Sequence, residues 1–213
     1  DYEDVITVEN AQGKVINDLN GEDIIRVAGP NSQLAGINVN YINAATVDTD
    51  GLDIAASYYF DTNSAGGFGL NLEATHFLSY EIPDPQGGTR DVVGLFNHDN
   101  FARSIPETKV NLAATWNLGN HSAAAIAYWV DDYKTTREVP PGESASIDSW
   151  TTLDLQYTYN LQFSESEAVI ALGAKNVFDE EPPRVYDGVN FSYDPKHHDP
   201  RGRMYYLRVK YAF

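Results

Sequence analysis

Two short stretches of the sequence carry side chains whose types could do chemistry. In DPKHHDP, His197 and His198 stand beside Asp194 and Asp199, and imidazole and carboxylate groups are common metal ligands. The two histidines are adjacent, however, and no further ligands follow at a spacing typical of metal sites. The sequence therefore predicts no metal site and no cofactor, with this histidine pair as the one metal-binding alternative.

The second stretch is DEEPPRVYDG, in which Asp179, Glu180 and Glu181 are consecutive. Catalysis by paired carboxylates needs two carboxyl groups in a cleft whose pKa values are driven apart. Consecutive acids ahead of two prolines are more typical of the start of a solvated loop. We therefore expect no enzyme activity, and the function must be sought in the elements that carry these stretches.

The overall composition excludes several classes of protein. The formal net charge is −17, which argues against binding nucleic acid because such proteins present a basic surface to phosphates. The absence of cysteine excludes disulfides and thiolate metal sites. No apolar run approaches the roughly 18 residues of a membrane-spanning helix, but the alternating strands of a membrane β-barrel need no such run.

Apolar and polar residues alternate along much of the chain, which indicates β-strands with two unlike faces. In one such segment Leu155 and Tyr157 alternate with Asp154 and Gln156. The polar positions hold mainly Asn, Thr, Ser, Gln and single acids rather than long charged side chains, as expected for the wall of a water-filled lumen. Strands are expected at residues 36–44, 50–60, 68–78, 109–118, 122–130, 152–161, 168–177 and 204–213.

The connections between these strands alternate in length. Short ones cover 61–67, 119–121 and 162–167, and long ones cover 80–107, 132–148 and 178–203. This alternation predicts an antiparallel transmembrane β-barrel, in which short turns lie on the periplasmic side and long loops are extracellular. Antiparallel parity then places the C-terminus on the periplasmic side. A soluble β-sandwich is the alternative.

Aromatic residues fall near both ends of the predicted strands, as in the two interfacial girdles of a membrane barrel. The predicted lipid-interface aromatics are Tyr58, Phe60, Phe68, Trp116, Trp129, Trp150 and Tyr159. The predicted lumen-facing residues are Asp53, Glu73, Asn111, Asp154, Gln156, Arg208 and Lys210. The long loops offer Arg90, Arg103, Arg137, Arg184, Tyr186 and Arg201 to anionic or sugar-like ligands, and Arg184, Tyr186 and Arg201 are the main candidates.

Three stretches resemble one family. The C-terminal stretch ALGAKNVFDEEPPRVYDG…YDPKHHDPRGRMYYLRVKYAF (171–213) is similar to the end of TonB-dependent outer-membrane receptors, with an NVFDEEPP segment, a YDP…HDPRGR segment and a last strand that closes on an aromatic residue. YINAATVDTDGLDIAASYYF (41–60) and SIPETKVNLAATWNLGNHSAAAIAYWVDDY (104–133) resemble earlier hairpins of the same family.

The resemblance implies a bacterial outer-membrane receptor that takes up a scarce nutrient, of the iron-chelate, cobalamin or glycan class, with energy from TonB. Residues 1–213 would be the C-terminal segment, of about eight strands, of a barrel that has 22 strands in the intact protein. The plug domain and the TonB box are expected upstream of this segment. The implied partners are outer-membrane lipid, the rest of the barrel and its plug, the TonB complex, the barrel assembly machinery and a small-molecule nutrient.

The last strand has a further implied role. In the family, alternate residues of this strand form the signal for the barrel assembly machinery, here Tyr205, Leu207, Val209, Tyr211 and Phe213. Two alternatives to the receptor are a passive porin or small barrel, since eight strands can close, and a fragment with open edges that assembles with itself. The sequence does not decide the structure of residues 1–36.

Overall fold

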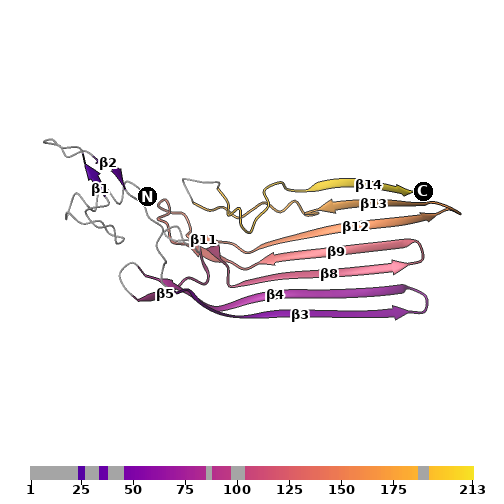
Figure 1. The fold of residues 1–213 in the computed structure, drawn as a ribbon, viewed down its shortest axis with the longest axis horizontal. Coiled ribbons are helices and arrows are strands. Elements are labelled where there is room, and N and C mark those ends of the chain that lie inside the picture. The colour runs from indigo at the N-terminus through magenta and orange to yellow at the C-terminus, as the bar shows by residue number, and fades with distance from the viewer. Residues whose placement is uncertain (1–23, 27–33, 38–45, 85–87, 97–103, 187–191) are drawn as a thin grey trace. The chain divides into compact units, whose positions relative to one another are not determined.

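The computed structural model describes residues 24–26, 34–37, 46–84, 88–96, 104–186 and 192–213 (Figure 1). The chain divides into two compact units, one of residues 1–47 and 82–90 and the other of residues 48–81 and 91–213. In the first unit, β1 (Ile24–Arg26) pairs antiparallel with β2 (Leu34–Ile37). Most of the strand predicted at 36–44 lies outside the described residues.

Seven long strands of the second unit form one antiparallel sheet (Figure 1). Neighbours in the chain are neighbours in the sheet, in the order β14-β13-β12-β9-β8-β4-β3. All seven are among the strands predicted from the sequence, with faces that are less distinct in 122–130 and 168–177, and the sheet confirms an all-β antiparallel fold. The strands are β3 (Asp48–Thr62), β4 (Gly66–Pro83), β8 (Thr108–Leu118), β9 (His121–Val130), β12 (Trp150–Gln162), β13 (Glu167–Lys175) and β14 (Met204–Ala212).

Strands β3 and β14 form the two edges of this sheet and do not pair with each other. A closed barrel of these strands alone would require that pairing, so the described part of the chain is an open sheet. Within the described residues there is no helix with the length and apolarity needed to cross a membrane.

The short turns lie at one end of the sheet, together with the C-terminus (Figure 1). The β8–β9 hairpin turns through Gly119 and Asn120, and Gly119 has φ +56°, a conformation that glycine adopts without steric cost. The long connections lie at the opposite end of the strands, so the predicted alternation of short and long connections is confirmed.

The long connections contain short strands of their own. Besides β5 (Thr89–Asp91), these are β6 (Leu95–Phe96), β7 (Ser104–Ile105), β10 (Tyr133–Thr135) and β11 (Ser146–Ile147). Strands β6, β7, β10 and β11 form a four-stranded sheet in which β10 runs parallel to β6. Two loops that are distant in sequence are therefore joined by backbone hydrogen bonds.

This small sheet contributes to a buried hydrophobic core. Tyr133 and Ile147 each have 1% of their surface exposed, and they pack with Phe96, Val130 and Val185. We call the part of the chain that surrounds this core the loop cluster, and it consists of residues 91–96, 104–107, 131–149, 176–186 and 192–203. The loop cluster contains the histidine stretch DPKHHDP (194–200). The acidic stretch DEEPPRVYDG begins inside it, at Asp179.

Candidate functional site

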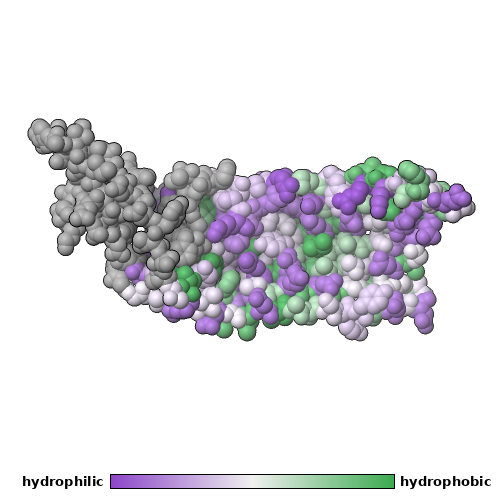
Figure 2. Space-filling model, viewed as in Figure 1, coloured by the Kyte–Doolittle hydropathy of each residue, from purple (hydrophilic) through white to green (hydrophobic). Residues whose placement is uncertain are grey.

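One face of the long sheet is apolar and widely exposed. The register places Tyr58 opposite Leu70 and Leu172 opposite Leu207, all on this face. Leu207 is 64% exposed. Figure 2 shows hydrophobic residues among hydrophilic ones at the surface of the sheet. A face with so many large apolar side chains in contact with solvent marks a surface that meets lipid or protein.

The edge strand β14 contributes four of the five predicted assembly-signal residues to this face, and the fifth, Phe213, directly follows the strand. Their partners across the ladder, Ala168, Ile170 and Leu172 among them, are small or apolar. The outer side of β14 has no neighbouring strand among the described residues. The predicted residues are therefore exposed on an open edge, and their recognition by an assembly machinery stays a prediction. These residues are Tyr205, Leu207, Val209, Tyr211 and Phe213.

Most of the predicted interface aromatics share the apolar face. At the turn end, the rings of Phe60 and Phe68 stack with centroids 5.2 Å apart, and Phe68 lies opposite Trp116. Tyr159 lies in the same row as Ile170, and at the other end Trp129 lies opposite Val110. Contact with lipid stays a prediction for these residues.

The structure contradicts the predicted lipid-interface role of Trp150. It lies opposite Val130 and has the strand parity of Asp154, so it belongs to the polar face. Its side chain is 3% exposed and its ring contacts that of His198 with centroids 5.3 Å apart. The prediction of a lipid-interface role for Trp150 is wrong, because a loop segment covers this end of β12 on the polar side.

The opposite face of the sheet is polar. Thr75 donates a hydrogen bond to Asp53 Oδ1 over 2.8 Å, and Tyr206 donates one to Gln156 Oε1 over 2.8 Å. Tyr206 lies over Gly173, where a Cβ atom would meet its ring at 2.2 Å. All seven residues predicted to face the lumen lie on this face of the sheet. Their contact with a water-filled lumen stays a prediction. They are Asp53, Glu73, Asn111, Asp154, Gln156, Arg208 and Lys210.

Two residues of the histidine stretch, Asp194 and His198, are buried in the loop cluster. The Tyr133 hydroxyl donates to Asp194 Oδ2 over 2.8 Å, and the Asp194 side chain is almost fully buried. The Tyr133 ring stacks on that of His198 at 6.2 Å. Burial lowers the pKa of His198 to about 4, with the charge of Asp194 opposing the shift. His198 is therefore neutral near pH 7, because its surroundings disfavour a charge.

No group of three or more potential metal ligands occurs among the described residues. His197 Nε2 lies 3.4 Å from the backbone oxygen of Ser104, and burial lowers the pKa of His197 as well. The two histidines are thus part of the packing between loops. The sequence could not indicate this, since Ser104 and Tyr133 are distant from them along the chain.

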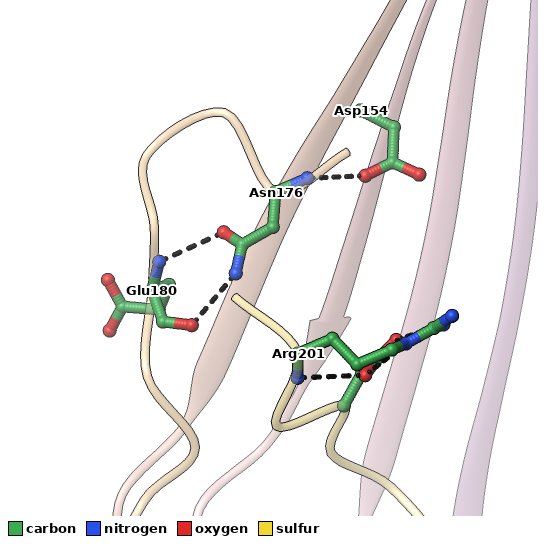
Figure 3. Close-up of polar contacts among 5 residues, drawn as sticks. Asp154, Asn176, Glu180 and Arg201 are labelled. Carbon is green, nitrogen blue, oxygen red and sulfur yellow. Dashed lines mark hydrogen bonds and ion pairs between the residues drawn. The ribbon is translucent and has the colours of Figure 1, made fainter. Parts of the chain in front are cut away.

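The acidic stretch forms a hydrogen-bonded connection at the base of the last loop (Figure 3). The buried Asn176 donates through Nδ2 to the Glu180 backbone oxygen and accepts at Oδ1 from the Glu180 backbone N–H, both over 2.9 Å. Its own N–H donates to Asp154 Oδ1 over 2.8 Å. Asn176 has φ +47°, which asparagine tolerates better than most residues.

Asp179 holds the other end of that loop, at Arg203. The Asp179 carboxylate accepts the backbone N–H of Arg203 over 2.7 Å, and the Arg203 guanidinium donates to the Val177 backbone oxygen. Within this stretch the Asp179 carboxylate is thus bound to loop backbone and lies near the Arg203 guanidinium, and Glu180 is bound through its backbone. The NVFDEEPP and HDPRGR segments therefore act together to close the loop of residues 176–203.

The main predicted ligand-loop residues make contacts with their own neighbours in the chain. Arg184 stacks over the Tyr186 ring at 4.7 Å, and the Tyr186 pKa is raised by a hydrogen bond with Glu143. Arg201 Nε donates to both oxygens of Asp199, at 2.8 and 2.9 Å, and this pairing lowers the pKa of Asp199. Of the other arginines, Arg90 is in β5, Arg137 follows β10, and Arg103 lies outside the described residues.

A cavity of about 330 Å³ lies where the polar face meets the loop cluster. Asp154, His197 and His198 were singled out from the sequence as candidate site residues. Most of the other lining residues become their neighbours only through strand pairing and loop closure. Its walls come from strands β9, β12, β13 and β14 and from the 195–202 segment. They include Tyr128, Trp150, Thr152, Asp154, Lys175, His197, His198, Asp199 and Met204.

An antiparallel sheet with an exposed apolar face, a polar face and long loops at one end defines a wall of a membrane β-barrel. A family model described as TonB dependent receptor-like, beta-barrel, matches residues 2–177. The chain therefore belongs to the TonB-dependent receptor β-barrel family, which is a family of the bacterial outer membrane.

Comparison with solved structures gives a mutant of the ferric enterobactin receptor from Pseudomonas aeruginosa, at 18% identity and a TM-score of 0.48. The match covers 77% of this chain and 22% of the receptor, so the chain spans about a fifth of the length of that protein. No curated protein matches the chain.

Proposed function

We propose that this chain is the C-terminal part of an outer-membrane receptor that takes up a scarce nutrient with energy supplied through TonB. The observation that carries the proposal is the family match over residues 2–177, on a sheet whose two faces suit lipid and water. The nutrient belongs to the iron-chelate, cobalamin or glycan class. The chain does no covalent chemistry of its own, because its acidic stretch serves to hold a loop.

The energetics support a membrane location for the apolar face. Burial of a large apolar side chain stabilises by about 1.5–3 kcal/mol, and this face exposes such side chains along several strands, including Leu52, Leu112 and Leu155. Outer-membrane lipid would cover them. With the loop cluster at one end of the strands, the loops are extracellular and the C-terminus is periplasmic.

The two open edges support a larger barrel. Backbone groups at an edge inside a membrane find no water, so β3 and β14 each need a neighbouring strand. The rest of the same barrel supplies those strands, and the plug domain lies against the polar face. The barrel assembly machinery recognises β14 before the barrel closes, and the TonB complex acts through the N-terminal part of the receptor.

Deletion of the gene in its host tests the proposal. Growth on, or uptake of, one limiting nutrient of these classes should be lost in the deletion strain and restored by the gene. Uptake should also stop when TonB is deleted or the proton gradient is collapsed. Uptake that persists without TonB would indicate a passive porin instead. A homogeneous multimer of this chain alone, with no effect on uptake, would favour a self-assembling structural protein.

A further inference from the structure

The last strand of the sheet, β14, is joined to β13 by a long loop rather than by a tight turn. In a hairpin, a short turn fixes which residues of the two strands lie opposite each other, and the connection of residues 176–203 is too long to do so. The bond from the Arg203 N–H to Asp179 holds the start of β14. Because β13 ends at Lys175, that bond attaches β14 to the loop and not to β13. The register of β14 therefore depends on contacts within the sheet.

The alternation of apolar and polar residues excludes only some of the wrong registers. A slip of one residue would turn Arg208 and Lys210 toward the apolar face, which disfavours it. A slip of two residues keeps every side chain of β14 on its present face, because the side-chain period of a strand is two. A further contact is needed to distinguish the observed register from these slipped ones.

Tyr206 reaches from β14 across β13 to β12 on the polar face. It lies opposite Gly173 of β13, which in turn lies opposite Gln156 of β12. A Cβ atom at position 173 would lie within 2.5 Å of the Tyr206 ring and hydroxyl group, so the ring occupies the space above the glycine. The hydroxyl donates to Gln156 Oε1 over 2.8 Å. We call these three residues the tyrosine bridge.

The tyrosine bridge fits only the observed register. Strand β13 contains one glycine, and a slip of two residues would place Tyr206 opposite Ala171 or Lys175 instead. Each of these has a Cβ atom, so the ring would turn away from the sheet and lose its hydrogen bond to β12. Tyr205, on the apolar face, lies opposite Ala174 and is 75% exposed. A tyrosine of the same strand thus stands away from the sheet where the opposite residue has a side chain.

We propose that the tyrosine bridge selects the register of β14 and thereby the stagger with which this strand meets the strand that closes the barrel. Stagger and strand number together determine the tilt and diameter of a barrel, so a slip of two residues at β14 would misalign the closing seam. The closing seam rests on the proposed function, since only a barrel has one. The register of β14 on β13 can be measured without any transport.

Disulfide cross-linking measures this register. Residues 1–213 contain no cysteine, and any cysteine elsewhere in the native gene product is first replaced by serine. Val169→Cys with Lys210→Cys gives the aligned product, because these positions lie opposite each other. Val169→Cys with Arg208→Cys, or with Ala212→Cys, gives a shifted product only after a slip of two residues in one direction or the other. Opposite positions are within disulfide range, whereas diagonal positions, at roughly 7–8 Å, are not.

The yields are compared in the folded band of the native gene product, which heat-modified mobility on gels identifies. The unmodified protein should give the aligned product and almost no shifted product. Tyr206→Ala and Gly173→Ala should each raise the ratio of shifted to aligned product roughly tenfold, the factor for one hydrogen bond with its ring contacts. If neither variant gives a folded band, Tyr206→Phe carries the test: it keeps the ring, loses the hydrogen bond and should raise the ratio about threefold.

A double variant separates the bridge from general stability. Gly173→Ala combined with Tyr206→Ala should give no more shifted product than Tyr206→Ala alone, because the three atoms nearest to a Cβ at position 173 all belong to Tyr206. Tyr59→Ala is the matched control, since Tyr59 covers Gly67 at the other edge of the sheet and should leave the β13–β14 ratio unchanged.

The proposal is overturned if the unmodified protein already gives shifted product freely, if the Tyr206 and Gly173 variants leave the ratio unchanged, or if Tyr59→Ala raises it equally. An additive effect in the double variant would also overturn it. Register selection in a protein whose uptake does not depend on TonB would overturn the proposed function and leave the tyrosine bridge standing.

Discussion

The hydroxyl of Tyr133 donates a hydrogen bond to the Asp194 carboxylate over 2.8 Å and thereby ties two long loops together. The two residues are 61 positions apart in the chain, and both are almost completely buried. Asp194 also accepts the Lys196 backbone N–H at its other oxygen. A buried carboxylate depends on such partners, so this contact is central to the loop cluster.

Removal of that hydroxyl should loosen the loops and leave the sheet intact. Tyr133→Phe deprives a buried charge of one partner, and we expect a loss of about 1.5–3 kcal/mol in the stability of the loop cluster. Limited proteolysis should show faster cleavage within residues 131–149 and 192–203. Tyr58→Phe makes the same chemical change on the exposed apolar face and should leave the cleavage rate unaltered. Equal cleavage of both variants would contradict a central role for the Tyr133–Asp194 contact.

Acid should destabilise the loop cluster through His198. Burial lowers the pKa of His198 from 6.5 to about 4, with His197, Tyr133, Trp150 and Asp194 as its neighbours. The unfolded loop therefore takes up a proton more readily than the folded one, and stability falls as the pH drops from about 6.5 to about 4. The loss amounts to about 3 kcal/mol at most, and above pH 6.5 this histidine contributes no pH dependence.

The same proteolysis assay at a series of pH values measures that loss. His198→Leu removes the titrating group and should flatten the profile in this window. His121→Gln removes a histidine at the turn end of the sheet, away from the loop cluster, and should keep the profile of the unmodified protein. If the His198→Leu profile retains its full acid dependence, carboxylates and not this histidine control the opening of the loops.

Asn176 should tolerate few replacements. Asn176→Ala removes two hydrogen bonds to Glu180 and places a side chain at φ +47°, so we expect a loss of about 2–3 kcal/mol. Asn176→Gly relieves the backbone strain but restores no side-chain hydrogen bond, so it should lie between the alanine variant and the unmodified protein. Denaturant unfolding of the refolded protein gives both values. If the Asn176→Gly and Asn176→Ala variants lose the same free energy of unfolding, the backbone conformation at position 176 does not contribute to the loss.

An introduced charge should destabilise the protein much more on the apolar face of the sheet than on the polar face. Leu155 and Ile126 are similarly exposed, at 42% and 46%, but Leu155 lies on the apolar face and Ile126 on the polar face. Leu155→Arg should destabilise the membrane-inserted protein by about 2–4 kcal/mol, the cost of a cation on the lipid side near the middle of the bilayer. Ile126→Arg, opposite Asp154, should cost little. Heat-modified mobility on gels reports the folded fraction, and equal losses would contradict a lipid-facing Leu155.

The strands and their faces were predictable because the signal is local. A strand turns alternate side chains to opposite faces, so the order Asp154, Leu155, Gln156, Tyr157 already separates the two surfaces. Turn residues such as Gly119 and Asn120 mark the hairpins in the same local way. The position of Trp150 near a strand end predicts an interface role, but its parity is that of Asp154 and its ring packs against His198, a contact that no local pattern indicates.

By itself the sequence determined the antiparallel strands, their two faces, the alternation of short and long connections and the family. Only the tertiary structure decided what the loops do: it buried His198 against Tyr133 and Trp150, tied Asn176 to Asp154, and formed a cavity between them. The physical reason is the separation along the chain of the residues in contact. Alternation depends on neighbours along the strand, whereas these contacts join residues far apart in the chain and leave no periodic trace in it.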